Sequence, residues 1–184
     1  DLTAAMTGAS EKALARTNVE YEKVYLHPGS HAGYYPGADP MHIKLLFGKP
    51  QGRILGAQIV GGDGVDKRID VLAVAIRAGM TVFDLQELDL AYAPPYGSGK
   101  DPVNIAGYAA ANILDGTVRV KHFNEIEKDD FILDVRTPAE FAKGSVPNAT
   151  NVPLGAIRSK LDELPRDRTI HAYCGVGLRS YIAC

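Results

Sequence analysis

The pattern of apolar residues changes at Asp115-Gly116, and this change constrains the fold more than any other feature. Before it, β-forming segments are joined by short Gly- and Pro-rich turns, which is typical of an antiparallel sheet. After it, short apolar strands alternate with helical segments, which is typical of a parallel sheet. A chain of 184 residues can hold two small domains. We therefore expect an α+β domain over 1–112, a linker over 113–120 and an α/β domain over 121–184.

The first domain should contain an antiparallel meander followed by helices. The segment Gly48–Gly52 is a hairpin turn signal between two β-forming runs. Val65, Ile69, Leu72 and Ile76 recur at helical spacing and form one apolar stripe. The expected elements are a helix over 7–16, strands over 21–27, 42–47 and 53–60, and helices over 65–78, from Thr81, and over 102–114.

The second domain should be built on a parallel sheet. The run 131–135 is apolar and suits a buried strand, and Thr137-Pro138-Ala139-Glu140 is a capping box that starts a helix. The expected elements are strands over 117–121, 131–135, 149–152 and 169–173, and helices from Thr137, over 154–164 and after the loop that follows Tyr173.

Cys174 lies where the last of these strands runs into a helix start. Such a junction gathers backbone N–H groups around one point, and the helix start favours an anion. The Arg179 guanidinium favours an anion as well. Both should lower the pKa of the Cys174 thiol and make it a nucleophilic thiolate near neutral pH. The alternative is a buried, inert thiol.

Composition excludes several classes of function. The net charge of −2 and pI near 6.2 indicate no nucleic-acid or membrane partner, and no apolar run reaches the roughly 20 residues of a membrane span. Two cysteines are too few for a disulfide scaffold and suggest cytoplasmic thiols. The five histidines are scattered, so we expect no metal site.

The second domain resembles rhodanese domains. The resemblance rests on Asp134-Val135-Arg136-Thr137-Pro138-Ala139-Glu140-Phe141, on the segment Gly144–Pro153, and on the loop from Cys174 to Arg179. It implies that the cysteine accepts a sulfane sulfur as a persulfide and that Asp134 and Arg136 support the site. The alternative for Asp134 is a structural role as a cap or as the ion-pair partner of Arg136. Ser145 departs from the histidine common in the family. The implied persulfide cradle is Gly175, Val176, Gly177 and Leu178.

A cysteine phosphatase is an alternative, because its loop also runs from Cys to Arg. Phosphatase loops hold five residues between the two, whereas four lie between Cys174 and Arg179. The smaller loop suits one sulfur atom better than a phosphate. Rhodanese domains also continue beyond this loop with further helices and a strand, so we expect the domain to be incomplete at its C-terminus and of doubtful activity by itself.

The first domain resembles the dimerisation domain of pyridine nucleotide-disulfide oxidoreductases, in the coenzyme A-disulfide reductase and NADH oxidase branch. The diagnostic strings are His31-Ala32-Gly33-Tyr34-Tyr35-Pro36-Gly37, the segment Gly62–Asp70, and Ala91-Tyr92-Ala93-Pro94-Pro95-Tyr96. The resemblance implies a homodimer, FAD and NAD(P)H bound by a half that this chain lacks, and coenzyme A bound by the intact parent. No Gly-x-Gly-x-x-Gly string is present, and we expect the chain alone to bind none of these cofactors.

In that family two tyrosines of this domain reach the partner's active site. The resemblance implies Tyr34 or Tyr35 from one loop and Tyr92 or Tyr96 from the other, where a phenol can donate a hydrogen bond to a leaving sulfur. Packing anchors are the alternative. A second implied contact is from Lys67-Arg68 to the phosphates of coenzyme A, against the alternative of a solvated helix face.

The two resemblances together imply part of an FAD-dependent reductase of coenzyme A disulfides, persulfides or polysulfides, fused to a sulfurtransferase domain. Both chain ends should lie inside a longer protein. The competing hypothesis is a non-catalytic dimerisation and interaction module.

Overall fold

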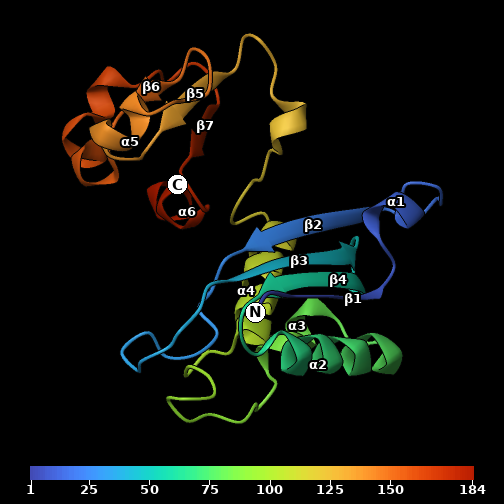
Figure 1. The fold of residues 1–184 in the computed structure, drawn as a ribbon. Coiled ribbons are helices and arrows are strands. Elements are labelled where there is room, and N and C mark those ends of the chain that lie inside the picture. The colour runs from blue at the N-terminus through green and yellow to red at the C-terminus, as the bar shows by residue number, and fades with distance from the viewer. The chain divides into compact units, whose positions relative to one another are not determined.

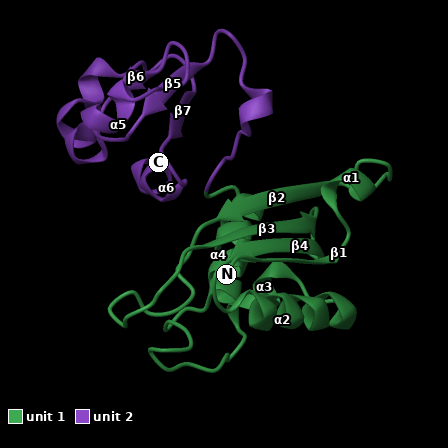
Figure 2. Cartoon of the chain, in the orientation of Figure 1, with its two compact units in different colours: residues 1–117 green, residues 118–184 purple.

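The computed structural model describes all residues, 1–184, as two compact units, residues 1–117 and 118–184 (Figure 2). The first unit is an antiparallel sheet with helices and the second holds a parallel sheet, so the expected fold classes are confirmed. No helix in either unit is long and apolar enough to cross a membrane.

Four antiparallel strands form the sheet of the first unit, in the order β1-β4-β3-β2. They are β1 (Thr3–Gly8), β2 (Tyr21–Leu26), β3 (Met41–Gly48) and β4 (Ile54–Gly61). The hairpin between β3 and β4 closes where Gly52 N–H donates to Gly48 O, 2.8 Å away. The turn that the sequence indicated is therefore present, with Gly52 at a φ of 74°.

Three helices of the first unit begin and end at residues suited to those positions. They are α2 (Val65–Ala78), α3 (Val82–Gln86) and α4 (Pro102–Leu114). Gly79 ends α2 in a left-handed conformation, and Thr81 and Asp101 begin α3 and α4 with capping boxes. All three helices were expected from these signals.

The helices cover one face of the sheet. Helix α2 packs against β1 and β4, α4 packs against β2 and β3, and α3 packs against α4 (Figure 1). Gly107 permits the α3–α4 approach, because a Cβ there would lie 2.8 Å from Val82 O. The fully buried core between the layers includes Met41, Leu45, Phe47, Ile59, Leu72, Leu85, Val103 and Ala106.

The helix expected over 7–16 is wrong for its first part. Residues Thr3–Gly8 form β1, which pairs with the outer edge of β4, and only the short α1 (Glu11–Leu14) is helical. Thr7 and Gly8 instead pair with Ala57 and Gly56 at the sheet edge, which outweighs the helix preference of the residues that follow them. Gly8 and Gly56 allow the close pairing, since a Cβ on Gly8 would lie 2.4 Å from Leu55 O.

The second unit contains a parallel three-stranded sheet in the order β6-β5-β7. Its strands are β5 (Phe131–Asp134), β6 (Thr150–Asn151) and β7 (Ile170–Tyr173). Its helices are the 3-10 helix η1 (Phe123–Glu125), α5 (Pro138–Ala142), the 3-10 helices η2 (Leu154–Ser159) and η3 (Leu161–Glu163), and α6 (Leu178–Ala183). Leu133, Val135, Val152 and Ile157 form its buried core.

Two expectations for this unit are wrong. Residues 117–121 form no strand, because they pair with neither outer edge of the sheet, β6 or β7, and a strand needs a pairing partner. The expected helix over 154–164 is divided into the two 3-10 helices. Pro153 precedes it, Gly155 lies in its first turn, and Pro165 follows, so the segment makes the short tight turns usual in connectors.

Candidate functional site

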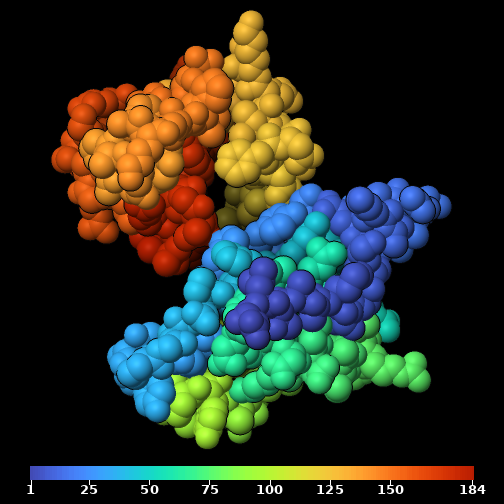
Figure 3. All heavy atoms as spheres, in the orientation of Figure 1, coloured from blue at the N-terminus to red at the C-terminus, as the bar shows by residue number.

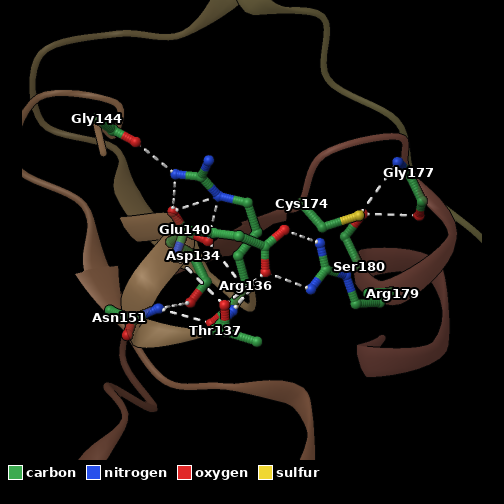
Figure 4. A network of polar contacts seen from close by, with 10 residues as sticks. All are labelled: Asp134, Arg136, Thr137, Glu140, Gly144, Asn151, Cys174, Gly177, Arg179 and Ser180. Carbon is green, nitrogen blue, oxygen red and sulfur yellow. Dashed lines mark hydrogen bonds and ion pairs between the residues drawn. The ribbon is translucent and has the colours of Figure 1, made fainter. Parts of the chain in front are cut away.

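Cys174 lies in the loop between β7 and α6, as the sequence indicated. Gly177 begins α6 with a φ of 92°, which turns its N–H back toward the sulfur. That N–H lies 3.1 Å from Cys174 Sγ, and the Ser180 hydroxyl lies 3.8 Å from it (Figure 4). The thiol is therefore held in a ring of hydrogen-bond donors at a half-buried position.

The Cys174 thiol has a lowered pKa. Burial raises it, but the backbone N–H groups of Ser180 and Val176, the Ser180 hydroxyl and the Gly177 N–H together lower the pKa of Cys174 below its ordinary value of 9.0. The thiolate is consequently more populated near neutral pH than in a free cysteine, which makes it a better nucleophile. This direction agrees with the sequence-based expectation, whereas burial alone raises the pKa of the Cys184 thiol.

Arg179 has a partner that the sequence did not reveal. Its guanidinium binds Glu140 of α5 through two hydrogen bonds, Nη1 to Oε2 at 2.8 Å and Nη2 to Oε1 at 2.7 Å (Figure 4). This ion pair raises the pKa of Arg179 and lowers that of Glu140, so both stay charged. The guanidinium is thus shared between Glu140 and the neighbourhood of Cys174, to which it is electrostatically coupled.

Asp134 and Arg136 form a separate cluster that holds the loop after β5. Asp134 is fully buried, and the Arg136 guanidinium meets its carboxylate at 2.6–3.0 Å. Arg136 also donates to Gly144 O at 2.8 Å, and the Asn151 amide donates to the carbonyls of both Asp134 and Arg136. The contacts of this cluster run to the loop of residues 136–151 and to the Tyr173 ring, and none of them reaches the sulfur.

Glu140 and Ser180 are the residues of this site that the sequence reasoning missed. Glu140 was noted only as the end of a capping box, where its carboxylate accepts from Thr137. Ser180 directly follows Arg179, within the first turn of α6. Both could have been recognised from the sequence, because each is a polar residue within or next to a rhodanese-like motif: Glu140 in the segment 134–141, and Ser180 directly after the loop from Cys174 to Arg179.

The first unit brings together two tyrosines from different loops. The hydroxyls of Tyr34 and Tyr92 lie 3.1 Å apart, and both side chains are exposed. In the space-filling view the two loops lie against each other at the lower edge of this unit (Figure 3). Tyr35 instead packs the edge of its ring on His31, and Tyr96 is exposed without joining the pair.

Arg68 is buried, with 2% of its surface exposed. Its guanidinium binds the Asp101 carboxylate at 2.8 Å and donates to Gly64 O, Ser30 O and Tyr96 O. It therefore ties α2 to the start of α4 and to both tyrosine-bearing loops. The interpretation of Arg68 as part of a solvated face is wrong, and its donors are committed to protein acceptors rather than free for a phosphate.

Lys67 differs from its neighbour. Its ammonium lies 3.4 Å from Ala91 O and 3.9 Å from Asp101, and about a third of its side chain is exposed. Lys67 keeps a charge near the second tyrosine loop, which makes it the better placed of the two for an anionic ligand.

The first unit does not have the architecture of a dinucleotide-binding site. The sheet of the first unit is antiparallel, whereas dinucleotide-binding folds use a parallel strand, a Gly-rich loop and a helix. No three His, Cys, Asp or Glu side chains come together in a group that could hold a metal ion.

Comparison with family models matches both units. Residues 1–101 match the pyridine nucleotide-disulphide oxidoreductase dimerisation domain, and residues 120–184 match the rhodanese-like domain.

Among curated proteins, coenzyme A disulfide reductase of Staphylococcus epidermidis is 44% identical over 110 residues, which cover 60% of this chain and 25% of that protein. Among solved structures, reduced Bacillus anthracis CoADR-RHD superposes with a TM-score of 0.95 at 50% identity, over 99% of this chain and 33% of that one. A NAD-dependent persulfide reductase from A. fulgidus gives a TM-score of 0.88 at 42% identity, over 100% of this chain and 33% of that one. The chain thus spans a quarter to a third of the length of these relatives.

The antiparallel sheet with its two tyrosine-bearing loops, followed by a cysteine loop at the end of a parallel strand, matches the two family models in their order along the chain. The chain belongs to the pyridine nucleotide-disulphide oxidoreductases through its dimerisation domain, and it carries a rhodanese-like domain after it.

Proposed function

We propose that this chain is part of an FAD-dependent, NAD(P)H-using reductase of coenzyme A disulfides, persulfides or polysulfides, and that its rhodanese-like domain carries sulfur as a persulfide on Cys174. The domain order and the names of the relatives, a coenzyme A disulfide reductase and a NAD-dependent persulfide reductase, support this function. The proposed domain limits are 1–112 for pairing, 113–120 for the linker and 121–184 for sulfur transfer.

The observation that carries the sulfur-transfer part is the set of donors around Cys174 Sγ. The Gly177 N–H at 3.1 Å and the Ser180 hydroxyl at 3.8 Å stabilise negative charge on the sulfur. The Cys174 thiolate attacks the outer sulfur of a persulfide R–S–SH. The S–S bond of the donor breaks, a new S–S bond forms on Cys174, and RS⁻ leaves.

Mass spectrometry of the chain after brief exposure to inorganic polysulfide tests this step. We expect a gain of one sulfur atom at Cys174, its loss on reduction with a phosphine, and no gain in Cys174→Ser. Cys184→Ser is the matched control and should still gain the sulfur, because the raised pKa of Cys184 makes it the weaker nucleophile. Sulfur found equally on both cysteines, or on neither, would contradict the proposal.

The first domain supplies the homodimer contact and the phenols of the reductase site. Tyr34 and Tyr92 are the proposed pair that reaches the partner's active site, since their hydroxyls meet at 3.1 Å on an exposed surface. Tyr35 and Tyr96 are the second choice in each loop, and Lys67 is the proposed contact for a phosphate of coenzyme A. A phenol placed in this way donates a hydrogen bond to the departing thiolate.

FAD and NAD(P)H are proposed to bind outside this chain, where they supply hydride transfer and reduction of the sulfur substrate. The chain's own part is to pair, to position the phenols and to hold the sulfur. The free thiols and the small net charge favour a cytoplasmic protein with no nucleic-acid or membrane partner.

The two domains are proposed to act as a relay. Cys174 passes its persulfide sulfur to a thiol such as that of coenzyme A, and the reductase half then reduces the sulfur bound to that thiol. In the full-length reductase, Cys174→Ser should slow persulfide-dependent NAD(P)H oxidation while coenzyme A disulfide reduction is unchanged. Equal persulfide turnover in the variant and the wild type would contradict the relay.

The two alternative functions predict different experimental results. A non-catalytic interaction module predicts no persulfide on Cys174 under any donor. A phosphatase needs its Arg for the phosphate oxygens, but Arg179 is bound by Glu140 at 2.7 and 2.8 Å. An aryl phosphate assay tests it, and we expect no release of phenol above the Cys174→Ser background.

A further inference from the structure

The side chains of Tyr34 and Tyr92 have little packing of their own. Tyr34 is 77% exposed and Tyr92 is 55% exposed, so contacts with the core do little to fix where their hydroxyls lie. The 3.1 Å contact between the hydroxyls therefore depends on the backbones of two loops, residues 27–40 and 87–101. Whatever sets the relative position of these loops also sets the phenol pair.

Arg68 contacts both loops from a buried position, with 2% of its surface exposed. Its Nη2 donates to Ser30 O at 2.8 Å in the first loop and to Tyr96 O at 3.2 Å in the second. The two acceptors lie close in sequence to the point where the loops join, because Ala32 N–H donates to Gly97 O at 2.9 Å. One nitrogen of this guanidinium therefore holds both loops to α2 next to the hydrogen bond between them.

The guanidinium of Arg68 is itself held in place. The Asp101 carboxylate accepts from Nε at 3.2–3.3 Å and from Nη2 at 2.8 Å, and Gly64 O accepts from Nη1 at 3.2 Å. Gly64 leaves the space for this group, since a Cβ there would lie 2.1 Å from Arg68 Nη1. Asp101 is buried and begins α4 directly after the second loop. The planar fork of donors is therefore fixed at both ends before it meets the loops.

Arg68 differs from the other buried side chains of α2, which all belong to the apolar core: Val65, Ile69, Leu72 and Ala75. A buried ion pair adds little to stability compared with well-packed apolar groups in the same place. Folding alone therefore gives no reason for a guanidinium at this position. Its contacts with the two tyrosine-bearing loops do give one.

We propose that Arg68 is a positioning residue of the reductase site, which fixes the loop of Tyr34 relative to the loop of Tyr92 so that the two phenols meet. The inference rests on the proposed role of these phenols as proton donors, and it adds the group that places them. Arg68 touches no substrate. Its effect reaches the reaction through the hydroxyl pair, where a displacement of about 1 Å is enough to lose about 10²-fold in rate.

A double-variant cycle in the full-length reductase tests the effect on the reaction. Arg68→Lys keeps a positive charge beside Asp101 but lacks the fork that reaches both loops. We expect kcat and kcat/KM for coenzyme A disulfide to fall together by about tenfold or more, with KM nearly unchanged. In the Tyr34→Phe background the same substitution should cost less than about twofold, because the phenol through which it acts is gone. Leu72→Val, which loosens α2 in its apolar core, is the control and should keep the wild-type kcat.

The phenol pair can also be followed without activity, by ¹³C NMR of the 184-residue chain labelled at tyrosine Cζ. The hydrogen bond with Tyr92 raises the pKa of Tyr34, whose signal is assigned with Tyr34→Phe. In Arg68→Lys the Tyr34 titration midpoint should fall toward its value in Tyr92→Phe. Gly64→Ala should act in the same direction, because its Cβ displaces the guanidinium and leaves Arg68 itself unchanged. Leu72→Val should keep the wild-type midpoint.

Wild-type kcat in Arg68→Lys would overturn the inference, as would unchanged Tyr34 midpoints in both Arg68→Lys and Gly64→Ala. So would a rate loss as large in the Tyr34→Phe background as in the wild type, since that would reflect a general loss of structure. A Tyr34→Phe reductase as active as the wild type would instead overturn the proposed role of the phenol. The NMR midpoints would then still decide whether Arg68 sets the pair.

Discussion

The hydroxyl oxygens of Tyr34 and Tyr92 lie 3.1 Å apart, although 58 positions separate the two residues. Their loops are joined near this point, since Ala32 N–H donates to Gly97 O at 2.9 Å. The hydrogen bond between the two hydroxyls raises the pKa of Tyr34 above its ordinary value of 10.0, so this phenol holds its proton more firmly. One hydroxyl of the pair donates to the other, whose own proton is left for an outside acceptor.

This pairing predicts unequal effects for the four tyrosines. In the full-length reductase, Tyr34→Phe and Tyr92→Phe should each lower kcat/KM for coenzyme A disulfide by about 10²-fold, the usual scale for losing a positioned proton donor. The double variant should be little worse than either single one, because the pair acts as a unit. Tyr35→Phe is the control and should stay close to wild type. Equal losses in Tyr35→Phe and Tyr34→Phe would contradict the assignment.

The buried Arg68 predicts a stability effect. Replacing it by Met removes the partner of the buried Asp101 and the donors to Ser30 O and Tyr96 O, and breaking a buried pair costs roughly 3–5 kcal/mol. Hydrogen exchange of the β3 and β4 amides should report this loss. Lys67→Met is the matched control, with a cost of about 0.5 kcal/mol or less expected for an exposed site. An Arg68→Met protein as stable as Lys67→Met would show that the pair contributes nothing.

His27 predicts a loss of stability at mildly acidic pH. Burial and the neighbouring His42, whose Nδ1 lies 2.6 Å from that of His27, lower the pKa of His27 below 6.5. The unfolded chain therefore binds the proton more readily, and the stabilisation present above pH 6.5 is lost as the pH falls. Carboxylates with lowered pKa values, such as Glu11, add their own losses only below about their ordinary value of 4.5.

Hydrogen exchange of the β2 and β3 amides between about pH 5 and 6.5 separates the histidine effect from the carboxylates. In His27→Gln the slope of stability against pH over this interval should flatten. An unchanged slope would mean that His27 is protonated equally in the folded and unfolded chain.

Local signals were enough to predict most of the fold. Gly79, Thr81 and the Asp101-Pro102 pair set the ends of α2, α3 and α4, because caps depend on neighbours in sequence. β1 could not be predicted in this way, since its stability comes from β4, which lies some 50 residues away in sequence. The strand expected over 117–121 was wrong because local sequence favoured it, whereas no strand of the sheet pairs with these residues.

The residues of the site also differ in whether local sequence or tertiary packing determines their position. The position of Cys174 between a strand and a helix is a local feature and was predictable. The partner of Arg179 was not, because Glu140 is 39 residues away and is brought close only by the tertiary fold of the second unit. The burial of Arg68 was not predicted for a similar reason. It depends on contacts with Ser30, Tyr96 and Asp101, which are far from Arg68 in sequence.

The separation of the Asp134 cluster from the sulfur predicts that its loss affects stability and leaves the thiol unchanged. Asp134→Asn keeps the shape but removes the charge that Arg136 binds at 2.6 Å in a fully buried position. Because Arg136 remains partly exposed, we expect a cost of about 2 kcal/mol, below the range for fully buried pairs. Exchange of the β5 amides measures that cost, and the pH dependence of Cys174 alkylation measures the thiol.

The alkylation midpoint of Asp134→Asn should match that of the wild type, since the donors that lower the pKa of Cys174 belong to the loop and α6. Ser180→Ala is the contrasting variant. It removes a hydroxyl 3.8 Å from the sulfur and should raise the midpoint, while the exchange of β5 stays at the wild-type rate. If Asp134→Asn moved the midpoint as far as Ser180→Ala does, Asp134 would belong to the sulfur site, and the distinction drawn between the two clusters would fail.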